Sequence, residues 1–94
     1  MYARLVRFVL GPGKEDAGQA IADELAPLIA AQPGCRSVTV FGDVSDGEFG
    51  IFVLWDSREN ANTAAQVIRP ILDQHLAGNV QRPPETRLFD VLSL

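Results

Sequence analysis

The stretch that most constrains the fold is residues 48–59, where a strand pattern passes directly into a helix start. Its first eight residues, EFGIFVLW, are rich in β-branched and aromatic side chains, which is typical of a β-strand. Ser57 follows Trp55 after one intervening residue, at the position where serine caps the amino end of a helix. A strand that ends at Trp55 and is followed at once by a capped helix predicts a compact unit of sheet and helix.

Apolar spacing along the rest of the chain predicts the remaining elements. Strand patterns cover residues 2–10, 35–42 and 86–94, and a helical pattern covers 14–32. Asp46-Gly47 lies between the second and third strands and is typical of a hairpin turn. Pro70 interrupts the second helix and suits a first helical turn, so it predicts a separate short helix over 70–76.

The predicted order is β-α-β-β-α-β, and we expect residues 1–94 to form one domain. Right-handed crossovers fold this order into a four-stranded antiparallel sheet with both helices on one face, the ferredoxin-like α+β arrangement. The first and third strands are apolar on both faces, although the helices cover only one of them. We therefore expect a homodimer in which the uncovered sheet faces pack together.

Charge and composition limit the classes of partner and the cellular compartment that we expect for this protein. Twelve acidic and eight basic residues give a net charge of −4, and no Lys/Arg cluster is present. Binding to nucleic acid or to an anionic membrane requires a basic patch, so we expect neither. No apolar run approaches the ~20 residues of a membrane span. The single cysteine, Cys35, excludes an internal disulfide, and we expect a cytoplasmic protein.

Two segments carry a resemblance to a known family. Pro33-Gly34-Cys35 after the first helix and VLWDSRE at 53–59, in this element order, resemble the antibiotic biosynthesis monooxygenase family over about residues 2–92. The resemblance implies a dimeric α/β barrel and a cofactor-independent oxygenase acting on a small aromatic molecule, such as a quinol, and O₂. A haem-binding or haem-degrading relative is one alternative. A non-catalytic dimeric module that binds a small ligand is another.

Two rare side chains are candidates for chemistry. His75 lies on the apolar stripe of the short helix, where it is the candidate general base, or the haem ligand in the alternative function. The structural interpretation is a histidine that interacts with the dipole at a helix C-terminus. Trp55 is either a pocket wall that stacks on a planar substrate or an anchor of the core.

Arg4 and Arg7 interrupt the apolar first strand and lie on opposite faces of it, because side chains alternate along a strand. One of them is the candidate for binding a substrate carboxylate or stabilising a phenolate, and the sequence does not decide which. Pairing with Asp90 or Glu48 on a neighbouring strand is the alternative. No His, Cys or carboxylate cluster has the spacing of a metal site, so we expect no metal. The family resemblance implies that no other cofactor is needed.

Overall fold

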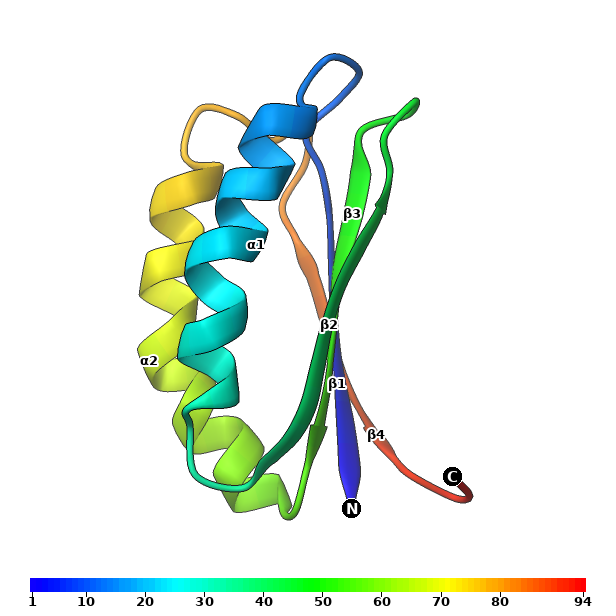
Figure 1. Ribbon diagram of the computed structural model, residues 1–94, viewed down its shortest axis with the longest axis vertical. Coiled ribbons are helices and arrows are strands. Elements are labelled where there is room, and N and C mark those ends of the chain that lie inside the picture. Colours follow the sequence, from blue (N-terminus) through cyan, green and yellow to red (C-terminus); the bar gives the residue numbers. More distant parts are fainter.

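The computed structural model describes residues 1–94 and places two helices against one face of a four-stranded sheet (Figure 1). The elements in chain order are β1 (Tyr2–Val9), α1 (Glu15–Ala30), β2 (Cys35–Asp43), β3 (Glu48–Trp55), α2 (Arg58–Leu76) and β4 (Glu85–Asp90). The order across the sheet is β2-β3-β1-β4, and each neighbouring pair is antiparallel. The ferredoxin-like α+β prediction is therefore confirmed. Neither helix is both long enough and apolar enough to cross a membrane.

The hydrophobic core fills the space between the helices and the sheet. On α1, Ile21, Leu25 and Ile29 recur at a spacing of four residues and are almost completely buried. They pack against apolar side chains of the two central strands, including the stacked rings of Phe8 and Phe49, whose centroids lie 6.0 Å apart. The helix-facing side chains of β3 are thus all buried, whereas on β1 Phe8 is buried and Arg4 and Val6 are only half-buried.

The junction between β3 and α2 has the predicted geometry. The strand ends at Trp55, and Ser57 has an extended backbone at the N-cap position of α2. The backbone N–H of Asn60 donates to Ser57 Oγ at 3.0 Å, and that hydroxyl donates to Asn60 Oδ1 at 2.7 Å. The cap satisfies one of the free amides of the first helical turn and sets where α2 begins.

The prediction of a separate short helix over 70–76 is wrong, because these residues belong to α2. It runs without interruption from Arg58 to Leu76 and includes Pro70. Proline removes the hydrogen bond that its amide would donate to the carbonyl of Gln66. Both residues lie on the exposed side of the helix, where water can bind that carbonyl. Burial of Leu72 and Leu76 on the opposite side keeps the last turns of α2 packed against the core.

Strand β4 is shorter than predicted. It spans Glu85–Asp90, whereas the apolar pattern predicts a strand over 86–94. Asp90 pairs with Tyr2, the first residue of β1, and the next contact is a hydrogen bond from the Val91 amide to the Met1 carbonyl at 3.0 Å. Pairing with β1 ends here, and residues 91–94 are not part of the strand.

Candidate functional site

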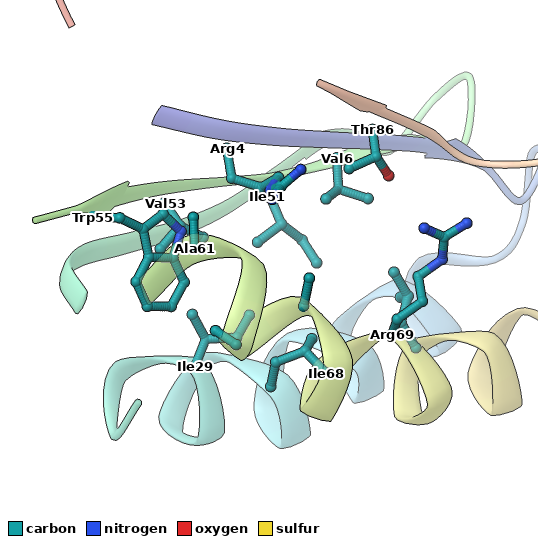
Figure 2. A pocket seen from close by; sticks show the side chains of 13 residues that line it. Arg4, Val6, Ile29, Ile51, Val53, Trp55, Ala61, Ile68, Arg69 and Thr86 are labelled. Carbon is teal, nitrogen blue, oxygen red and sulfur yellow. The ribbon is translucent and has the colours of Figure 1, made fainter. Parts of the chain in front are cut away.

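A small apolar pocket lies between α2 and the helix-facing side of the sheet, and Figure 2 shows its lining. Its volume is about 60 Å³, and ten of its thirteen lining residues are hydrophobic. The lining consists of Arg4, Val6, Ile29, Ile51, Val53, Trp55, Ala61, Ala64, Ala65, Ile68, Arg69, Leu72 and Thr86. The pocket therefore combines an apolar interior with a few polar groups, as small-molecule sites do.

The space exists because α2 presents alanines to the sheet. Ala61, Ala64 and Ala65 line the pocket on the helix side, and their methyl groups leave a gap that longer side chains would fill. The volume of about 60 Å³ is well below the ~300–1,000 Å³ of typical ligand sites. An aromatic ring therefore enters only when flexible lining side chains, Arg4 and Arg69 among them, move outward.

Arg4 supplies a cation to the pocket wall. Its Nη2 donates to Asn62 Oδ1 on α2 at 2.9 Å, and no carboxylate forms an ion pair with it. Burial lowers the pKa of Arg4, and the positive charges of Arg58 and Arg69 lower it further. A guanidinium stays protonated at neutral pH despite such a shift. The Arg4 cation is thus partly desolvated and held by a neutral amide.

Two further arginines surround Arg4. Arg69 lines the pocket and makes a loose ion pair with Asp73, with 3.6 Å between Arg69 Nε and Asp73 Oδ1. The Arg58 guanidinium lies over the ring of Tyr2, 5.0 Å from its centroid. Three of the eight basic residues therefore gather near the pocket of a chain with net charge −4, and no acidic residue lines that pocket. This part of the molecule favours an anionic ligand.

Trp55 forms one end of the pocket. Its side chain belongs to the buried core, with an exposed fraction of 3%. The indole Nε1 is buried and has no hydrogen-bond partner. An unsatisfied buried donor costs about 1–3 kcal/mol, so this nitrogen is an unusual feature of the core. Trp55 is thus both an anchor of the core and a wall of the pocket.

The pocket contains two of the four predicted site residues, Arg4 and Trp55. Arg7 lies on the opposite face of the sheet, where it forms an ion pair with Glu48 that raises the pKa of Arg7. His75 is not among the lining residues, and its Nε2 contacts a carboxylate oxygen of Glu24 on α1. No three side chains of His, Cys, Asp or Glu gather where a metal ion could bind.

Sequence reasoning missed Arg69 and Thr86 as lining residues. Arg69 follows Ala65 by four positions, so a helical projection of one uninterrupted α2 places both on the same side of the helix. A helix broken before Pro70 obscured that relation. Thr86 lies opposite Val6 in the β1–β4 register, which no local pattern in the sequence reveals.

The sequence pattern of more than half of the chain decides the family. The family model "Antibiotic biosynthesis monooxygenase" matches residues 1–66. The chain belongs to the antibiotic biosynthesis monooxygenase family. The matched part includes β1, β3 and the first half of α2, so Arg4, Trp55 and the pocket alanines lie within it. No curated protein sequence matches this member of the family.

Solved structures share its fold. The chain is similar to NE2512, a protein of unknown function from Nitrosomonas europaea, with 21% identity, a TM-score of 0.84 and coverage of 99% of this chain and 90% of that one. It is similar to Rv0793 from Mycobacterium tuberculosis, with 21% identity, a TM-score of 0.81 and coverage of 99% and 96%. A monooxygenase from the gene ActVA-Orf6 of Streptomyces coelicolor, in complex with nanaomycin D, has 19% identity, a TM-score of 0.77 and coverage of 99% and 88%.

Proposed function

We propose that this family member is a cofactor-independent monooxygenase that binds a small quinol as its anion and presents that anion to O₂. The observation that carries the proposal is Arg4, a partly buried cation without a carboxylate partner in the wall of an apolar pocket. Membership of the monooxygenase family supports it. So does the complex of the similar Streptomyces monooxygenase with nanaomycin D.

The proposed mechanism assigns electrostatics and desolvation to the protein. A positive charge beside the quinol oxygen lowers the pKa of that hydroxyl, so the proton leaves to water at the pocket mouth without a protein base in the lining. The apolar walls exclude water and hold the ring in place while the electron-rich anion reacts with O₂. One oxygen atom bonds to a ring carbon and the other leaves as water. The quinol supplies all four electrons and becomes a hydroxyquinone.

Oxygen uptake tests the proposed function. We expect the protein to accelerate O₂ consumption with at least one member of a quinol panel, at one O₂ per quinol, above the rate with heat-denatured protein. Mass spectrometry with ¹⁸O₂ should find one labelled atom in the product. A panel that binds without any accelerated uptake would favour the non-catalytic module instead.

The same assay tests His75, the general base proposed from the sequence. His75 contacts Glu24 and is not part of the pocket lining, so we expect His75→Ala to retain the wild-type rate within about twofold. A loss of a hundredfold or more in a correctly folded variant would restore His75 to the mechanism. Circular dichroism of the variant supplies the folding control.

We also propose that the protein is a homodimer joined through the open face of the sheet. Phe41, Phe52 and Phe89 lie on that face with exposed fractions of 47%, 37% and 37%. Next to Phe41, a groove of about 520 Å³ includes Leu5 and Arg7. A second copy would bury these rings against their equivalents.

Light scattering coupled to size-exclusion chromatography tests the dimer at micromolar concentration. The expected mass is twice the 10.2 kDa of the chain. Phe52→Asp should give monomers, because it places a charge among the apolar side chains of the open face. Val67→Asp is the matched control, since Val67 is 45% exposed on α2, away from the open face. A wild-type monomer would refute the proposal.

A further inference from the structure

We infer that the indole N–H of Trp55 is the hydrogen-bond donor that determines the specificity of the pocket. It selects a ligand ring that carries an acceptor oxygen on the edge nearest Trp55. The ligand class is then a hydroxyquinone or its quinol anion, with its neutral oxygen at Trp55 and its ionised oxygen toward the arginines. The inference deepens the proposed function and rests on it for the reaction. For binding, it rests on the geometry of the pocket.

The Trp55 nitrogen is a buried donor without a partner. It has less than 1 Å² of accessible surface and no hydrogen-bond partner in the protein. Figure 2 shows the nitrogen edge of the ring turned toward the middle of the pocket. The missing hydrogen bond is a cost to the empty protein that a ligand oxygen would remove, whereas a phenyl ring here would carry no such cost.

The polar side chains that line the pocket are mostly hydrogen-bond donors. The side chains of Arg4, Arg69 and Trp55 are hydrogen-bond donors with no acceptor atom. Thr86 supplies the only side-chain hydroxyl and can both donate and accept. A ligand rich in donors would offer these groups no acceptor and would leave the Trp55 N–H unpaired, while a ligand rich in acceptors can bind all three. The pocket therefore discriminates by hydrogen-bond polarity as well as by charge.

The donors follow one another along the pocket in a definite order. Trp55 lies at one end and Arg69 at the other, with Arg4 between them on the sheet side (Figure 2). Arg4 and Arg69 are cationic and Trp55 is neutral, so the two ends differ in charge. A ring with a neutral carbonyl at one edge and an ionised hydroxyl at the other matches this order, with the carbonyl at Trp55.

Nuclear magnetic resonance of the wild-type protein tests the inference directly. The chain has one tryptophan, so its indole N–H gives a single resonance in a ¹⁵N-labelled sample. The probe is 2-hydroxy-1,4-naphthoquinone, which is already oxidised and undergoes no turnover, and naphthalene is the control of matched ring size. We expect the naphthoquinone to bind and move the indole proton downfield, and naphthalene to produce no downfield shift. Absence of naphthoquinone binding, or equal shifts with both compounds, overturns the inference.

Trp55→Phe provides the second measurement. Loss of the N–H should weaken naphthoquinone binding about tenfold and leave naphthalene binding within about twofold, as titration calorimetry would measure. Equal weakening of both compounds would show that Trp55 contributes area only and would overturn the inference. If the variant does not fold, the wild-type resonance decides. Quinone binding without oxygen uptake contradicts only the proposed function, and uptake without an indole shift contradicts only this inference.

Discussion

Arg4→Gln is expected to lower kcat/KM for quinol oxygenation by about 10²–10³-fold, the cost typical of removing one preorganised group that stabilises a developing anion. Glutamine keeps an uncharged hydrogen-bond donor on a shorter side chain, so the variant removes the positive charge without placing an apolar group in the wall. The loss should appear mainly as a lower kcat with quinols that are neutral in solution. Quinols that are already ionised should lose less, because their deprotonation no longer depends on Arg4.

Two matched variants separate the site from general electrostatics. Arg82→Gln removes the same charge from an exposed loop and should leave kcat/KM within about twofold. Arg7→Gln removes the other arginine of β1, which lies on the opposite face with Glu48, and should also retain activity if the dimer persists by light scattering. Equal losses in Arg4→Gln and Arg7→Gln would contradict the assignment of the site to the helix-covered face.

Gly47→Ala is expected to destabilise the fold by about 3 kcal/mol or more, which for a chain of this size is a large part of the total. Gly47 has a φ of 72°, and a Cβ at this position would lie 1.9 Å from the carbonyl oxygen of Gly11. Its own carbonyl accepts the Leu10 amide at 2.8 Å, which ties the end of β1 to the start of β3. Strain and a backbone clash therefore act together.

Urea denaturation compares this variant with Gly13→Ala. Gly13 has a similar φ of 80°, but no atom lies within 4 Å of a Cβ built there. Only the cost of about 1–2 kcal/mol for a left-handed backbone at a residue other than glycine applies to that control. The midpoint should fall much further for Gly47→Ala, with an unchanged slope. Equal losses in the two variants would mean that the turn moves to relieve the clash.

Local chemistry made much of the fold predictable. The strand over 48–55, the cap at Ser57 and the turn at Asp46-Gly47 each depend on a few adjacent residues, and each lies where the sequence predicts it. Pro70 shows the limit of such rules. Its preference for a first helical turn is a local effect of modest size, whereas burial of α2 against the sheet extends over its whole length.

The candidate site was less predictable, because its residues are distant in the chain. Strand alternation predicts that Arg4 and Arg7 face opposite ways, but only the packing of α2 identifies the face of Arg4 as the pocket side. His75 satisfies the local requirements of a base, yet its contact is Glu24 on the other helix. The unpaired Trp55 nitrogen has no signature in the sequence, since being unpaired is a property of everything around it.

The sequence by itself determined the order of the elements, the covered and uncovered faces of the sheet, and the resemblance that the family match confirms. These depend on side-chain periodicity and turn chemistry, which operate over a few residues. Only the tertiary structure decided that Arg4, Arg69 and Trp55 share one pocket, because that requires the register of β1 against β3 and the placement of an unbroken α2. Pairing and packing join residues 65 positions apart, and no local pattern encodes that distance.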